Sequence, residues 1–122
     1  MGCLKTIAGF LNSRSGGTLL IGVMDDGTPV GIGEDGFANE DKMLLHLDNM
    51  IKERLGPSHM MYIHPRFEDF DGIRVLAVEC SPGRSPVYVK DGAQERFFIR
   101  MGASTADLNT SQAHQYINER FD

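Results

Sequence analysis

The chain has 122 residues, which suffice for one compact domain and are too few for two of ordinary size. Its residues are 41% hydrophobic and 24% charged, a composition that excludes a mainly disordered protein. Twelve basic and 17 acidic residues give a formal net charge of −5. A protein that attracts nucleic acid through its overall field has the opposite sign, so phosphate binding here requires a local basic patch.

The two cysteines, Cys3 and Cys80, are too few for a disulfide framework and are not spaced like zinc ligands. Lys5 and Thr6 interrupt the apolar stretch that a secretory leader would need. No apolar run approaches the roughly 20 residues that span a bilayer. We therefore expect a soluble cytoplasmic protein with reduced thiols and no membrane partner.

The first half of the chain predicts two helices and two strands. Apolar residues recur at helical spacing over 4–11, and again over 43–55 after an N-cap at Asn39. Residues 18–23 form a continuous apolar run, which predicts a strand covered on both faces and therefore a central one. Residues 29–32 predict a short returning strand at an edge, because its proline cannot donate to a ladder.

The second half predicts two hairpins and a final helix. Their strands cover residues 60–70 and 73–80 in the first hairpin, and 86–90 and 95–101 in the second. Each pair flanks an Asp-Gly turn signal. A helix follows the polar segment 109–111. Together these elements predict a single two-layer α+β domain over residues 1–122, with about three helices and a mixed or antiparallel sheet of about five or six strands.

Three glycines, Gly31, Gly33 and Gly36, match the G-x-G-x-x-G pattern of dinucleotide-binding loops. Glu34 and Asp35 stand between them and would repel a pyrophosphate. The pattern is meaningful only inside a strand–helix–strand unit, and the first element here is a helix. We therefore predict no nucleotide cofactor.

Two aspartates, Asp25 and Asp26, follow the first predicted strand, at a place where functional carboxylates are common. A divalent metal needs two or three converging carboxylates. An aspartate before glycine in a turn is also favoured by its backbone preference alone. The residues by themselves favour the turn, and we predict no metal site.

Basic and aromatic side chains alternate along one face of the predicted strand over 95–101. Guanidinium groups fork onto phosphates, and an exposed ring can stack on a base. The alternative is an outward face whose arginines pair with neighbouring carboxylates, or a phenylalanine buried beneath a helix. The candidate nucleic-acid contacts, with those of the adjacent hairpin and the Gly-rich loop, are Arg14, Arg84, Lys90, Arg96, Phe98 and Arg100.

Two blocks of the sequence form a recognisable pattern. The first comprises Lys5-Thr6-Ile7-Ala8-Gly9-Phe10-Leu11-Asn12-Ser13, Gly16-Gly17-Thr18-Leu19-Leu20-Ile21-Gly22-Val23, Asp25-Asp26-Gly27 and Val30-Gly31-Ile32. The second comprises Pro86-Val87-Tyr88 and Phe98-Ile99-Arg100-Met101-Gly102-Ala103-Ser104-Thr105. Together they resemble the Schlafen/AlbA-type DNA-binding domain family. The resemblance covers about Lys5 to Glu119, and its first block is the more specific.

The resemblance implies a bacterial or archaeal regulator-like module that binds DNA or RNA and is fused to further domains. In nuclease-active relatives, two glutamates on a strand before the first helix join an aspartate that corresponds to Asp25. That glutamate strand has no counterpart before Met1. We therefore expect a non-catalytic domain cut from a longer protein, with a metal-dependent nuclease remnant using Asp25 as the least favoured function. The second function considered is an oligomerisation or protein-interaction module, since a missing strand would leave a sheet edge open.

Overall fold

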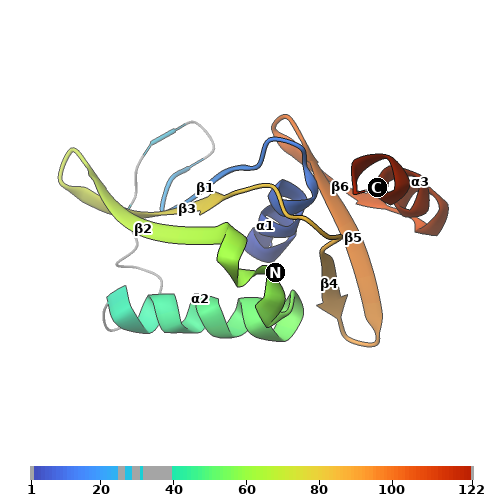
Figure 1. Cartoon of the computed structure of the whole chain (residues 1–122). Helices are drawn as coiled ribbons and strands as arrows, with labels where there is room; N and C mark the ends of the chain where they lie inside the picture. Colours follow the sequence, from blue (N-terminus) through green and yellow to red (C-terminus); the bar gives the residue numbers. More distant parts are fainter. Residues whose placement is uncertain (1, 25–26, 29–30, 32–39, 122) are drawn as a thin grey trace.

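The computed structural model of the chain describes residues 2–24, 27–28, 31 and 40–121 (Figure 1). In chain order the elements are α1 (Gly2–Asn12), β1 (Gly17–Ile21), α2 (Glu40–Arg54), the 3-10 helix η1 (Pro57–Tyr62), β2 (Ile63–Phe70), β3 (Ile73–Cys80), β4 (Tyr88–Asp91), β5 (Gln94–Met101), β6 (Ser104–Leu108) and α3 (Thr110–Arg120). No helix in this described part is long and apolar enough to cross a membrane.

The six described strands pair antiparallel in two three-stranded sheets, with the orders β1-β3-β2 and β4-β5-β6. The predicted α+β class, strand number and three main helices are confirmed, although the strands divide between two sheets. Helix α1 lies between the sheets, α2 lies along the first sheet, and α3 lies beside the second (Figure 1). Gly9 of α1 lies so close to the backbone of Ile99 and Arg100 that an added Cβ would be only 3.1 Å from the Arg100 nitrogen.

Strand β1 is covered on one face only, and the prediction that both of its faces are covered was wrong. It pairs with β3, which lies between β1 and β2. Its burial alternates, and Leu20 is 40% exposed. The continuous apolar run therefore places one side on the core and the other toward solvent. The central strand is β3, where the four residues 75–78 are buried.

The turns and strand ends refine the sequence prediction. Asp71 and Gly72 both have positive φ, at 52° and 82°, as a two-residue hairpin turn requires. Strand β2 begins three residues later than predicted, because η1 occupies the preceding segment. Strand β6 was not predicted, since its polar residues conceal a strand that pairs with β5. The strand expected over 29–32 lies outside the described residues apart from Gly31.

Strand β5 is buried on both faces because two apolar clusters meet there. Phe98 belongs to the larger cluster, which also contains residues of α1, α2 and β3. Phe97 and Ile99 point the other way and pack with Ala113 of α3. Helix α1 and helix α3 therefore cover opposite faces of the second sheet.

Asn12, the last residue of α1, is completely buried and joins these parts. Its Nδ2 donates to the carbonyl oxygens of Val87 at 3.0 Å and Phe98 at 2.8 Å. Its Oδ1 accepts the backbone N–H of Val87 at 2.8 Å. The Tyr116 hydroxyl donates to the Asn12 carbonyl oxygen at 2.6 Å. One residue therefore links α1 with both neighbouring strand segments and with α3.

We expect Asn12→Ala to lower the free energy of unfolding by about 3 kcal/mol, because it leaves the buried N–H of Val87 and two carbonyl groups without partners. Urea denaturation measures the change. The control is Asn118→Ala, which removes the same side chain from an exposed position on α3. A loss below about 1 kcal/mol in Asn12→Ala would show that water or a relaxed backbone replaces these bonds.

His59 in η1 gives the fold a predictable dependence on pH. The side chain is 9% exposed, and burial lowers its pKa from the usual range. The unfolded chain therefore binds a proton more readily than the folded chain, so stability falls as the pH drops below about 6.5. We expect urea midpoints to fall between pH 7.5 and 5.5, and to fall less in His59→Leu. Parallel pH profiles for the two proteins would contradict this origin.

Candidate nucleic-acid interface

Arg120, in the last turn of α3, holds two loops together. Its Nε and Nη2 donate to the carbonyl oxygen of Ser13 at 3.1 and 2.9 Å, and Nη2 also donates to that of Gly83 at 2.9 Å. Both acceptors are neutral, so they orient the guanidinium without cancelling its charge. Sequence reasoning missed Arg120, because a basic residue in the last helical turn is common for its interaction with the helix dipole.

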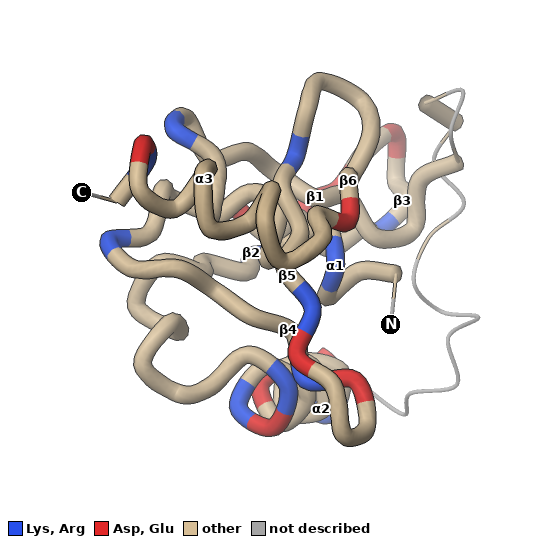
Figure 2. The backbone as a smooth tube through the Cα atoms, turned by 90° about the vertical axis from the view of Figure 1, so that its right-hand side faces the viewer, with Lys and Arg blue, Asp and Glu red and all other residues tan. Residues whose placement is uncertain are grey.

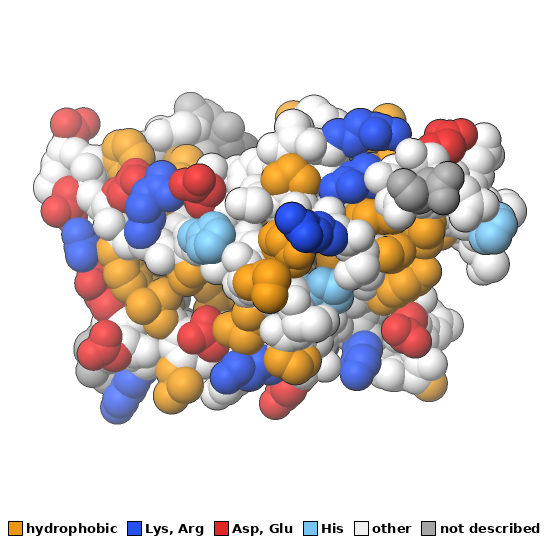
Figure 3. All heavy atoms as spheres, viewed as in Figure 1, with side chains coloured by type: hydrophobic (Ala, Val, Ile, Leu, Met, Phe, Trp, Pro, Cys, Tyr) orange, Lys and Arg blue, Asp and Glu red, His pale blue; other side chains and the backbone are white. Residues whose placement is uncertain are grey.

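Arg14 and Arg84 come directly after the two residues whose carbonyl groups Arg120 binds. Chain connectivity therefore places both beside Arg120, and both are exposed. The Nη2 of Arg14 donates to the carbonyl oxygen of Glu119 at 3.3 Å. Basic side chains gather beside the C-terminal end of α3 in the space-filling view (Figure 3). We call Arg14, Arg84 and Arg120 the arginine cluster.

No carboxylate of the described residues forms an ion pair with a member of the arginine cluster. Ion pairs with carboxylates do hold Arg66, Arg74 and Arg96. Glu119 meets Arg14 through its backbone carbonyl and not through its carboxylate. On a protein with a net charge of −5, the cluster is the kind of local basic patch that phosphate binding requires.

Arg96 does not join the cluster, because two carboxylates compensate it. Its Nη1 lies 3.0 Å from Asp91, and its Nη2 lies 2.5 Å from Asp107. The hydrogen bonds that Arg96 donates, first to Asp107 and then to Asp91, raise the pKa of Arg96 above its usual range. Acidic and basic positions adjoin along β4 and β5 (Figure 2). Arg96 therefore matches the alternative considered above, an arginine paired with neighbouring strand carboxylates.

Phe98 is not the exposed stacking ring that the sequence suggested. It is only 2% exposed and belongs to the core beneath α1. The Lys5 ammonium lies 5.5 Å from the centre of its ring, and the Arg96 guanidinium lies 5.0 Å from it. The alternation of Arg and Phe along β5 thus reflects a buried ring flanked by cations, and we remove Phe98 from the interface.

The remaining two predicted contacts lie apart from the cluster. Lys90 is exposed on β4 and faces Glu95 across the hairpin. Arg100 lies at the other end of β5, where its Nη1 donates to the Thr105 hydroxyl at 2.8 Å. Its guanidinium stacks over the Phe10 ring at 5.4 Å. Of the predicted set, Arg14 and Arg84 are the two whose backbone positions adjoin the residues that Arg120 binds.

A cavity of about 330 Å³ opens beside Arg100. The lining residues are Thr6, Phe10, Thr18, Leu19, Leu20, Val23, Met24, Gly27 and Arg100. The Nε of Arg100 is buried and has no hydrogen-bond partner among the described residues. None of the arginine cluster lines this cavity, so the two basic sites are distinct.

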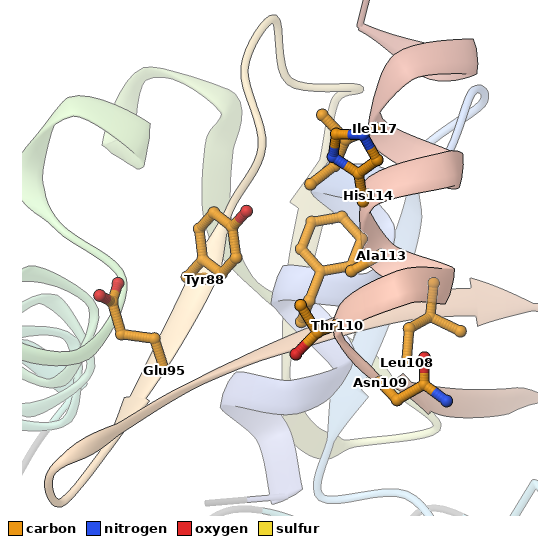
Figure 4. Close-up of a pocket in the computed structure, with 9 residues that line it drawn as sticks. Tyr88, Glu95, Leu108, Asn109, Thr110, Ala113, His114 and Ile117 are labelled. Atoms are coloured by element: carbon orange, nitrogen blue, oxygen red, sulfur yellow. The ribbon is translucent and has the colours of Figure 1, made fainter.

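A second cavity of about 330 Å³ lies between the β4–β5 hairpin and α3. Figure 4 shows Tyr88 and Glu95 of the hairpin on one side, with His114 and Ile117 of α3 on the other. The described residues that line it include a carboxylate and no lysine or arginine. This cavity is therefore unsuited to an anionic ligand.

The predicted carboxylate and glycine motifs fall largely outside the described residues. Asp25, Asp26, Gly33 and Gly36 all lie there, so the structure says nothing about their placement. In the part that the structure describes, no group of three or more His, Cys, Asp or Glu side chains is placed to hold a metal ion.

Comparison with known proteins places the chain in a family. Its fold is similar to that of the DIP2311 protein from Corynebacterium diphtheriae, with a TM-score of 0.69 and 20% identity over 99% of this chain. The chain spans 19% of the length of that solved chain. No curated protein matches the sequence significantly. Residues 1–109, which include both sheets, match the family model described as Schlafen, AlbA_2, and the chain therefore belongs to this family.

Proposed function

We propose that this domain binds nucleic acid through the arginine cluster and acts as a non-catalytic regulatory module. The observation that carries the proposal is that Arg120 binds the carbonyl groups of the residues directly before Arg14 and Arg84, so three arginines from separate segments lie close along the backbone, none of them in an ion pair with a carboxylate of the described residues. Guanidinium groups present paired N–H donors that match phosphate oxygens. Membership of the Schlafen, AlbA_2 family supports the same function.

The expected binding mode is recognition of the phosphate backbone. Phosphate contacts position a protein on nucleic acid but read no sequence by themselves. Carbonyl acceptors fix Arg120, and the exposed Arg14 and Arg84 directly follow the two residues that it binds. The site therefore suits DNA or RNA of many sequences, with affinity that falls steeply as salt concentration rises.

We further propose that the module belongs to a longer cytoplasmic protein of bacterial type. The similar bacterial structure is a chain of which this domain covers 19%. Cys3 and Cys80 are both free thiols, as is usual in a reducing compartment. Burial raises the pKa of the Cys80 thiol to about 12, so that thiol is an inert part of the core.

Replacing both exposed arginines, Arg14→Ala with Arg84→Ala, is expected to weaken DNA and RNA binding at least about tenfold and to lower the slope of log affinity against log salt by about two. Each lost contact returns one phosphate to its counterions. Fluorescence anisotropy over a salt series measures both quantities. Arg120 is left intact, because its bonds to Ser13 and Gly83 hold the loops.

The matched control is Arg66→Ala with Arg74→Ala. It removes the same two charges from the first sheet, where both arginines are exposed and paired with acids. We expect binding to change less than about twofold, because these charges are already compensated. Equal losses in the two double variants would indicate a response to net charge alone, and absence of binding at low salt would overturn the proposal.

A second candidate function, self-association, has an observation of its own. Leu20 of β1 and Phe70 of β2 are each 40% exposed, and they share the sheet face opposite α2 because they pair with Ala77 and Ile73 of β3. Exposed apolar patches on a sheet are typical of interaction surfaces. If the protein self-associates through this patch, light scattering at high concentration shows a dimer, and Leu20→Lys makes the protein monomeric. A monomeric parent protein at the same concentration would contradict this alternative.

A further inference from the structure

The guanidinium of Arg100 is held in place yet incompletely bonded. Its Nη1 donates to Thr105 on the neighbouring strand β6, and its flat face lies over Phe10 of α1. Its Nε is buried without a hydrogen-bond partner in the described part of the chain. Buried polar groups in native proteins are nearly always bonded, so an orphan donor on a charged group indicates a missing acceptor.

Arg100 also lines a cavity that has a distinctive wall. Among the described residues that line it, Arg100 is the one that carries a charge, and no carboxylate of that part of the chain forms an ion pair with it. The remaining lining is largely apolar and includes Leu20 and Met24, which are 40% and 54% exposed. A ligand that fits both features has an anionic group attached to an apolar or flat body.

We infer that this pocket binds one unpaired nucleotide, with its phosphate on Arg100 and its base against the apolar wall. The inference rests on the proposed function for the class of ligand. A guanidinium presents charged N–H donors that match phosphate oxygens, and the bond from Nη1 to Thr105 fixes the orientation of the Arg100 group.

The size of the pocket selects a single nucleotide over a duplex. About 330 Å³ is at the lower end of the range for ligand pockets, so it accommodates one small group. A base inside a duplex is stacked and paired, and its extrusion costs free energy, whereas a single strand offers unstacked bases freely. The same unit is also available as a free nucleoside monophosphate, and the two sources are distinguished by experiment.

The first experiment titrates the whole 122-residue chain with adenosine 5′-monophosphate and with adenosine, using calorimetry. We expect the monophosphate to bind at least about tenfold more tightly than adenosine, and Arg100→Gln to remove at least tenfold of its affinity, or about 1.4 kcal/mol. Arg100→Lys keeps the charge but loses the paired donors, so we expect an intermediate loss. Thermal unfolding of each variant verifies that it is folded.

The matched control is Arg96→Gln, on the same strand and the same face of β5, where Asp91 and Asp107 already occupy the guanidinium. We expect it to leave monophosphate binding unchanged. Equal binding of adenosine and its monophosphate, or a folded Arg100→Gln with unchanged affinity, overturns the inference. So does the absence of binding at millimolar monophosphate.

Anisotropy with a single-stranded oligonucleotide and its duplex then identifies the source. If the single strand supplies the nucleotide, Arg100→Gln weakens binding of the single strand and leaves binding of the duplex unchanged. If the free nucleotide is the ligand, Arg100→Gln changes neither of these two affinities. The two proposals can also fail separately. If Arg14→Ala with Arg84→Ala abolishes oligonucleotide binding but Arg100→Gln leaves the affinity for the monophosphate unchanged, the proposed function is retained and the nucleotide pocket is overturned. Monophosphate binding that depends on Arg100, without any oligonucleotide binding, overturns the function of the arginine cluster and retains the pocket.

Discussion

The buried amide of Asn12 is the contact on which the second sheet depends. Strand β4 pairs with β5 from Tyr88 opposite Phe97, so Val87 and Phe98 would form the next pair of the ladder. The Asn12 side chain stands between them, bonded to Val87 on both its N–H and its carbonyl and to the Phe98 carbonyl. It therefore replaces a ladder hydrogen bond at the point where α1 enters the sheet. Without it, buried backbone groups would have no partner.

This constraint also positions the proposed interface. Because Asn12 ends α1 in a fixed place, the next residues, Ser13 and Arg14, are directed toward α3. The hydroxyl of Tyr116 binds the Asn12 carbonyl, and one turn later Arg120 binds that of Ser13. One hydrogen-bonded arrangement therefore connects Asn12, which ends α1 and is buried in the core, with the arginine cluster on the surface.

The arginines of this chain differ in what surrounds them rather than in their chemistry. Arg96 is compensated by two carboxylates, Arg120 is bonded to neutral carbonyl groups, and Arg100 retains a buried donor without a partner. The first is part of the sheet, the second presents charge to solvent, and the third suits a ligand with acceptor oxygens. A guanidinium contributes to binding only where its charge remains available.

The sequence by itself determined the local elements: the helical faces, the Asp-Gly hairpin turns and the two blocks that indicated the family. These are short-range properties, since apolar spacing and turn preference act within a few residues. Only the tertiary structure decided that one face of β1 is exposed, that Phe98 is buried, and that Arg14 meets the carbonyl group of Glu119 from 105 positions along the chain. Such outcomes depend on which distant strand, carboxylate or carbonyl comes alongside, and no spacing within one segment encodes that neighbour.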